Sequence, residues 1–253
     1  MTELLLPLGM AVAAGLVGCF AVMRKMSLAS DALSHVALPG IGLAIALHLN
    51  PVVGGLAALF LGTFLVWALE YKTRISTETV IGVVFSAALA IGSMITTGEE
   101  LIEALFGSGR KSSLYETALG LVAVLVVVVF LVRAKQRLVI ALVSPDLART
   151  TGIDVPRLNL LYLLSFAISV ALGLRYLGVL LMGSLIIIPA ATAKHLARNL
   201  DGMLRIAVGV SVASTLLGTW IAQFLRVETG PVVIVVAAGC FFLSLLARRP
   251  EAA

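Results

Sequence analysis

The stretch ALGLVAVLVVVVFLVRAKQR, residues 118–137, joins an uncharged apolar run to a cluster of three basic residues. The segment 115–133 is long enough to cross a bilayer, which takes about 20 mostly apolar residues. Lys and Arg gather in the cytoplasmic loops of membrane proteins. The stretch therefore predicts a membrane-spanning helix whose C-terminal end lies on the cytoplasmic side.

The composition extends this interpretation to the whole chain, whose 253 residues are 60% hydrophobic and 12% charged, with a mean hydropathy of +1.12. A soluble domain carries about 25% charged residues, so a soluble globular protein is excluded. Basic cytoplasmic loops account for the net charge of +5, and nucleic acid is not expected as a partner. The sequence predicts an all-α polytopic membrane protein that forms one transmembrane domain over residues 1–253.

Further apolar segments predict eight or nine spans in all. Basic segments alternate with weakly charged ones, and they lie at 24–25, 70–74, 133–137, 194–198 and 248–249. This alternation favours nine spans, with the N-terminus outside and the C-terminus in the cytoplasm. The count falls to eight if 32–49 and 51–69 are irregular. The predicted spans are 4–23, 32–49, 51–69, 78–97, 115–133, 158–174, 177–193, 204–224 and 231–247.

The segment SDALSHVALPG, residues 30–40, carries Asp31 and His35 just before a long apolar run. Their i, i+4 spacing puts both side chains on one face of a helix. A carboxylate inside a membrane costs about 2.5–3.5 kcal/mol, and its default explanation is functional. Two interpretations stay open from the residues alone. The pair contacts a metal ion, or Asp31 caps a helix N-terminus near the membrane interface.

A carboxylate oxygen with an imidazole nitrogen suits zinc or manganese. Two ligands per chain are too few for a closed structural site, whereas incomplete coordination suits an ion that must also leave. A rise of about 1.5 Å per residue puts Asp31 only about one or two turns inside the cytoplasmic end of its predicted span. A site near the middle of the membrane would need this segment to be re-entrant or shifted.

The cytoplasmic stretch VSPDLARTTGIDVPRLNLLYLL, residues 143–164, predicts one short helix near 144–152. Ser144 is the expected N-cap, with Pro145 at the first helical position and Asp146 in the first turn. Gly152 falls where a left-handed residue would end the helix. The helix either lies at the membrane interface or fits a socket on another protein.

The segment LFGSGRKSS, residues 105–113, lacks the spacing of a phosphate-binding loop, because Ala104 replaces its first glycine and Arg110 follows Gly109. No other segment matches such a loop, so the chain is not expected to hydrolyse ATP. The charge alternation predicts that this segment is an outer loop. An intramembrane metalloenzyme would need three ligands and a base, for example H-E-x-x-H, which the sequence does not contain.

Four stretches together resemble the membrane permeases of bacterial ABC importers for zinc and manganese. The likeness runs from about residue 20 to the end of the chain in the expected order, and it does not specify the metal. The stretches are MRKMSLASDALSHVALPGIGLA, VSPDLARTTGIDVPRLNLL, LGVLLMGSLIIIPAATAKHLAR and TGPVVIVVAAGCFFLS.

The resemblance implies an ABC importer permease fold in the bacterial inner membrane and a homodimer with one ion pathway. It implies that a divalent ion, zinc or manganese, passes Asp31 and His35 by alternating access, with no cofactor bound permanently. A permease for siderophores or cobalamin is the nearest rival, and the Asp–His pair and the short chain favour a bare ion.

The resemblance also implies partner proteins. An extracytoplasmic metal-binding protein would deliver the ion, and two cytoplasmic ATP-binding subunits would hydrolyse ATP. These subunits are expected to dock at the helix near 144–152, where the contact residues would be Pro145, Asp146, Leu147, Ala148 and Gly152.

Overall fold

A computed structural model describes residues 2–26, 29–73, 75–95, 114–176 and 179–246. Within these ranges every regular element is an α-helix, which confirms the predicted all-α class. The predicted outer loop at 105–113 lies outside the described residues.

Seven of the described helices are long and apolar enough to cross a membrane. An eighth long helix, α10 (Val179–Leu196), contains Pro189. The seven are α1 (Thr2–Met23), α4 (Pro51–Thr73), α5 (Thr77–Ile95), α7 (Leu114–Val143), α9 (Val155–Tyr176), α11 (Leu200–Leu225) and α12 (Thr229–Leu246).

The predicted span at 32–49 is wrong as a single helix, because two short helices occupy it. They are α2 (Ala29–His35) and α3 (Leu38–Ala46). The physical reason is Pro39, whose ring clashes with the carbonyl four residues earlier, that of His35, in a continuous helix. The segment 51–69, in contrast, lies within the continuous helix α4.

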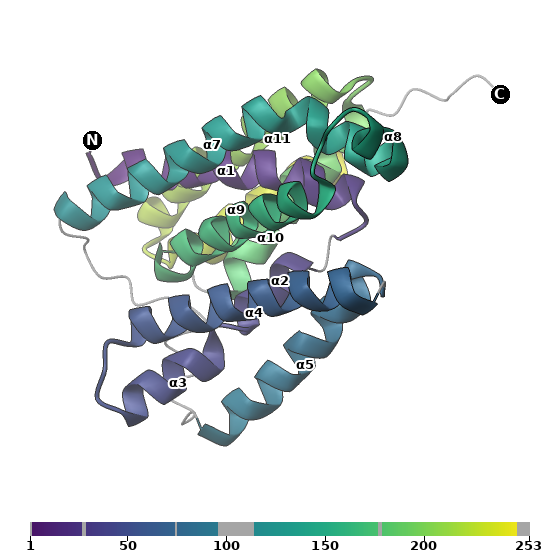
Figure 1. The fold of residues 1–253 in the computed structure, drawn as a ribbon. Coiled ribbons are helices and arrows are strands. Elements are labelled where there is room, and N and C mark those ends of the chain that lie inside the picture. Colours follow the sequence, from purple (N-terminus) through teal and green to yellow (C-terminus); the bar gives the residue numbers. More distant parts are fainter. Residues whose placement is uncertain (1, 27–28, 74, 96–113, 177–178, 247–253) are drawn as a thin grey trace.

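The helices form two groups, which Figure 1 shows one above the other. In the larger group α1 is the most buried of the seven candidate spans, and it packs against α7, α9, α10 and α11. The smaller group consists of α3, α4 and α5. The two groups meet where α4 packs on α9 and where α2 packs against α5 and α10.

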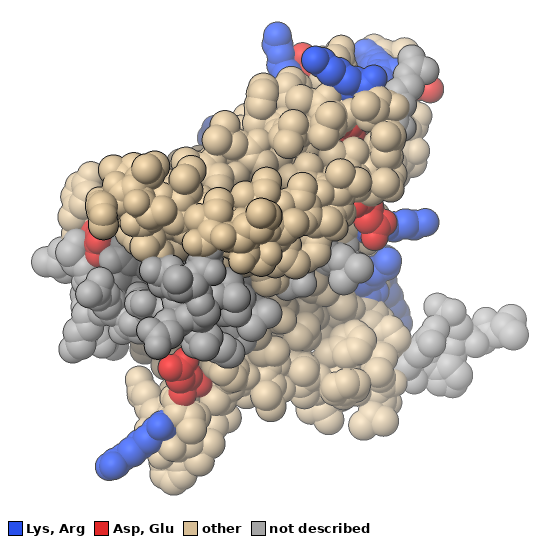
Figure 2. All heavy atoms as spheres, turned by 90° about the horizontal axis from the view of Figure 1, so that it is seen from below, with Lys and Arg blue, Asp and Glu red and all other residues tan. Residues whose placement is uncertain are grey.

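One end of the molecule collects the basic residues. The short helix α8 (Pro145–Thr150) lies at this end in Figure 1, and the start of α1 lies at the other. Most Lys and Arg side chains visible in Figure 2 lie toward the same right-hand end, and wide uncharged areas separate them from the opposite end. This distribution agrees with the predicted orientation, in which the basic end faces the cytoplasm.

Candidate ion path and partner-docking end

His35 is the last residue of α2, and it lies where the two helix groups meet. The side chain is half-buried, and its ring centroid lies 5.6 Å from that of Phe85 on α5, at an interplanar angle of 54°. Asp31 lies one turn earlier in the same helix, so the predicted helical spacing of the pair is confirmed.

The break after α2 is held by close packing against α4. The side chain of Val36 occupies the space that Gly62 leaves open, since a Cβ at Gly62 would lie 2.4 Å from it. Farther along, a Cβ placed on either Gly40 or Gly54 would lie 2.2 Å from the carbonyl oxygen of the other. The backbones of α3 and α4 are therefore in direct contact, and the two helices are expected to move together.

The described residues contain no group of three or more His, Cys, Asp or Glu side chains close enough to hold a metal ion. A closed zinc site takes four protein ligands. The described side chains therefore form no complete metal site, and the side chain of Asp31 lies outside them. An incomplete set of donors can contact an ion in passing, or it can contribute to a site shared with another chain.

A part-buried polar network at the basic end joins α4 and α9 to the start of α5 and to the residue that follows α1. Arg24, which follows α1, donates a hydrogen bond to Oδ1 of Asn159 on α9 and lies 4.4 Å above the ring of Tyr162. Nδ2 of Asn159 donates to Oε2 of Glu70 on α4 at 2.7 Å, and Thr77 donates to Oε1 of Glu70 at 2.6 Å. Burial lowers the pKa of Arg24, and Tyr162 and Glu70 oppose that shift.

The sequence predicts the basic segments at 24–25 and 70–74 only as cytoplasmic loops and does not indicate this network. Its partners lie 89 and 135 residues apart in the chain. Another hydrogen bond also joins residues 89 positions apart. Nε1 of Trp67 on α4 donates to the carbonyl oxygen of Pro156 on α9 at 2.9 Å. Together these bonds tie α4 to the start of α9.

The N-terminal end of α8 is capped as predicted. Ser144 is the N-cap, and its hydroxyl accepts a hydrogen bond from the backbone N–H of Leu147 at 3.3 Å. Pro145 takes the first helical position, and Asp146 lies in the first turn. The hydroxyl of Ser144 pairs with one of the free N–H groups at the helix start, and Pro145 has no N–H that needs a partner. Even this six-residue helix therefore has a defined beginning.

The C-terminal end of α8 also has the predicted form. Gly152 has a φ of +79°, in the left-handed region. Its N–H donates to the carbonyl of Arg149 at 3.1 Å, and the N–H of Ile153 donates to the carbonyl of Ala148 at 2.9 Å. These two bonds form a Schellman motif, which stops the helix at a fixed residue.

The structure separates the five predicted contact residues of α8 into two kinds. Pro145, Asp146, Leu147 and Gly152 are exposed, with Leu147 at 55% exposure. Ala148 is completely buried and packs into its own chain. A polar groove of about 780 Å³ lies beside this helix, and its lining includes Arg24, Glu70, Lys72 and Arg149.

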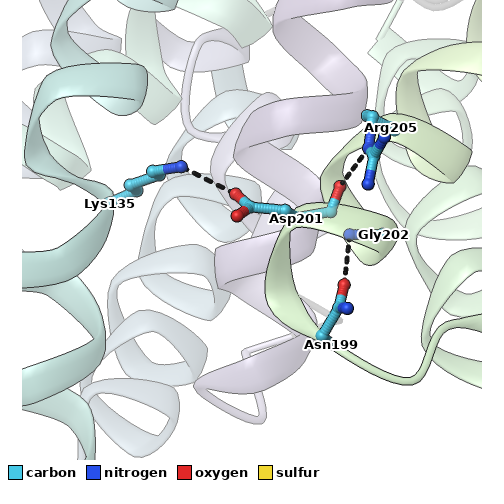
Figure 3. A network of polar contacts seen from close by, with 5 residues as sticks. All are labelled: Lys135, Asn199, Asp201, Gly202 and Arg205. Carbon is cyan, nitrogen blue, oxygen red and sulfur yellow. Dashed lines mark hydrogen bonds and ion pairs between the residues drawn. The ribbon is translucent and has the colours of Figure 1, made fainter.

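A second polar contact at the basic end joins α7 to α11 (Figure 3). Nζ of Lys135 lies 2.7 Å from Oδ1 of Asp201. Asn199 caps α11, since its side-chain oxygen accepts from the N–H of Gly202 at 2.7 Å, and Nε of Arg205 donates to the backbone carbonyl of Asp201 at 3.2 Å. This cluster fixes the start of α11 against α7.

These features define a class: a polytopic helical membrane protein with a broken helix in its interior and a capped helix exposed at its basic end. The model of the ABC 3 transport family matches residues 2–248, and the chain belongs to this family. The seven apolar spans and this membership agree with the expected multi-pass protein of the bacterial inner membrane.

Individual relatives agree with the family match. The high-affinity zinc uptake system membrane protein ZnuB of Haemophilus influenzae is 33% identical over 92% of this chain and 91% of its own length. The manganese transport system membrane protein MntC of Listeria innocua is 28% identical over 93% of this chain and 85% of its own. Other relatives are named for iron transport.

Among solved structures, PsaBC from Streptococcus pneumoniae in complex with Fab is similar to this chain with a TM-score of 0.79 at 25% identity. The match covers 95% of this chain and 88% of the other. The predicted ABC importer permease fold is therefore confirmed.

Proposed function

We propose that this chain is the permease subunit of an ATP-driven importer of divalent metal ions, zinc or manganese, and that two copies form one ion pathway. The observation that carries this proposal is the broken helix pair α2–α3 inside the protein, with His35 at the break. Non-helical backbone at membrane depth is tolerated where it lines a path or is enclosed by protein. In transporters such breaks accompany the substrate site.

The chemistry of α2 fits a divalent ion as the substrate. Asp31 supplies a hard oxygen and His35 an imidazole nitrogen, a donor set that suits zinc and manganese. A second copy of the chain would bring the donors to four, the number that zinc takes. Binding by few and separate donors also lets the ion leave toward the cytoplasm.

The exposed face of α8 supports docking of a cytoplasmic ATP-binding subunit. Leu147 offers an apolar contact, and the caps at Ser144 and Gly152 hold the helix in shape without help from a partner. Hydrolysis of ATP then takes place on that subunit, and one subunit docks on each copy of the permease. An extracytoplasmic metal-binding protein delivers the ion to the opposite end.

Uptake of radioactive zinc or manganese by cells that carry variants of this chain tests the proposal. We expect Asp31→Asn and His35→Ala each to abolish most uptake, because each removes a donor, while membrane insertion is unchanged. Asp31→Glu should keep partial uptake, because it preserves the charge. His48→Asn is the control, because His48 lies beyond α3 with a φ of +56°, which Asn tolerates.

The capping interpretation makes the opposite forecast for the same assay. Asn and Ser are good N-caps, so Asp31→Asn and Asp31→Ser would then transport normally. Normal uptake with Asn at position 31 would refute the ion-path assignment. Uptake of a chelated metal in preference to the free ion would favour the rival permease class.

A further inference from the structure

A shallow groove of about 720 Å³ runs along the outer surface between α7 and α9. It belongs to the larger helix group, and α7 lies on the far side of that group from α4 and α5 in Figure 1. The apolar part of its lining consists of Leu125, Val126, Val129, Phe130 and Ala134 from α7 and Leu158 and Leu161 from α9.

The two charged residues of the groove lie together at its cytoplasmic end. They are Arg133 and Arg137, both exposed and spaced i, i+4, so they share one face of α7. About 20 residues of helix cross a hydrocarbon core of about 30 Å, so a span that starts at Tyr115 leaves the core near residue 134. Both guanidinium groups therefore lie at the level of the lipid headgroups.

Neither arginine has a hydrogen-bond or ion-pair partner among the described residues, whereas two other basic residues at this end do. Lys135, between them in sequence, pairs with Asp201 (Figure 3), and Arg157 on α9 pairs with Asp154 at 2.9 Å. The groove thus combines an apolar floor with two cations that have no anionic partner in the described part of the chain. A guanidinium is well suited to bind phosphate oxygens.

We propose that this groove binds an anionic phospholipid of the cytoplasmic leaflet. The phosphate lies between Arg133 and Arg137, and an acyl chain lies along the apolar floor formed by α7 and α9. Basic pockets between membrane helices on the cytoplasmic side bind acidic headgroups in this way. A soluble anion would use the arginines and leave the apolar floor uncovered, so a lipid accounts for both parts of the groove.

Native mass spectrometry of the purified full-length chain tests this site. The probes are phosphatidylglycerol and phosphatidylcholine with identical acyl chains. We expect bound phosphatidylglycerol to exceed phosphatidylcholine. In R133Q/R137Q the affinity for phosphatidylglycerol should fall about 25-fold, from about fivefold for each arginine at a membrane surface, with phosphatidylcholine unaffected.

R157Q/R205Q is the matched control, because it removes two exposed positive charges from the same end of the molecule outside the groove. This variant should bind phosphatidylglycerol as the original chain does. Equal loss in both double variants would show a response to net charge alone and would overturn the proposal, as would equal binding of the two lipids by the original chain.

Val129→Trp tests the apolar half of the site. Val129 is 41% exposed, so a larger side chain can fill the groove without entering the core, and circular dichroism verifies the fold. We expect weaker binding of phosphatidylglycerol although both arginines remain. Unchanged binding, or equal competition by inorganic phosphate, would show that the site takes only an anion. Conversion of a dimer to a monomer by this variant would show that a second copy covers the groove. Each of these results would overturn the lipid assignment.

Discussion

Replacement of Gly152 isolates the effect of backbone conformation at the end of α8. Gly152 has a φ of +79°, and a Cβ added there would meet no other atom within 4 Å. The left-handed region costs an ordinary L-residue about 1–2 kcal/mol. Asn tolerates this region better, and a β-branched residue tolerates it worst. The expected order of stability for α8 is therefore Gly, Asn, Ala and Val.

Hydrogen exchange of the backbone amides measures this effect directly. The amides of Gly152 and Ile153 donate the two bonds of the Schellman motif, so they are protected only while α8 keeps its end. A penalty of about 1–2 kcal/mol raises the open population about 5- to 30-fold. We expect exchange at these amides to accelerate by that factor in Gly152→Ala and by more in Gly152→Val.

Two outcomes would refute this reasoning. If Gly152→Asn exchanged as fast as Gly152→Val, steric contact and not backbone conformation would control the site. If Gly152→Val matched the original chain, the left-handed turn would not be what ends α8. Gly209→Ala is the control, because Gly209 lies within α11 with open space at its Cβ position, and its substitution should leave the exchange of α8 unchanged.

Three further predictions follow from the packing. Leu147→Asp places a charge on the exposed face of α8. We expect the variant to insert normally into the membrane but to recover less of the ATP-binding subunit on co-purification. Full recovery would contradict the docking proposal. Asn159→Leu removes the hydrogen bonds to Arg24 and Glu70 and should destabilise the protein by about 1–3 kcal/mol. This loss would appear as a lower melting temperature. An unchanged melting temperature would show that the network does not stabilise the protein. Gly18→Ala puts a Cβ 1.9 Å from the carbonyl oxygen of Ile186, so we expect little monodisperse protein after detergent extraction, whereas Gly82→Ala, with open space, should give a normal yield.

Local signals account for what the sequence predicted correctly. Runs of about 20 apolar residues identify membrane spans whatever their tertiary contacts, because the thickness of the bilayer sets the length of a span. The ends of α8 were equally predictable, since Ser144 and Gly152 act on backbone groups within three or four residues. The charge alternation predicts an orientation from loop charge alone, which needs no knowledge of tertiary contacts.

Two features were not predicted correctly, one of them local and the other dependent on distant partners. The span at 32–49 has the composition of one helix, and only the local effect of Pro39 indicates that it is two. A basic residue at a helix end gives the same sequence pattern whether it is solvated or paired. The role of Arg24 therefore became visible only when the fold placed Asn159 beside it.

The arrangement of contacts gives α4 a central place in the proposed transport cycle. Four residues separate α8 from Val155, where α9 begins, and α9 is bound to α4 by the hydrogen bond from Asn159 to Glu70. In turn, α4 touches α3 backbone to backbone at Gly40 and Gly54. Close-packed elements of this kind shift as units and do not deform continuously. We infer that a displacement of α8 by a docked subunit is carried by α9 and α4 to α3, and so to the break that follows His35.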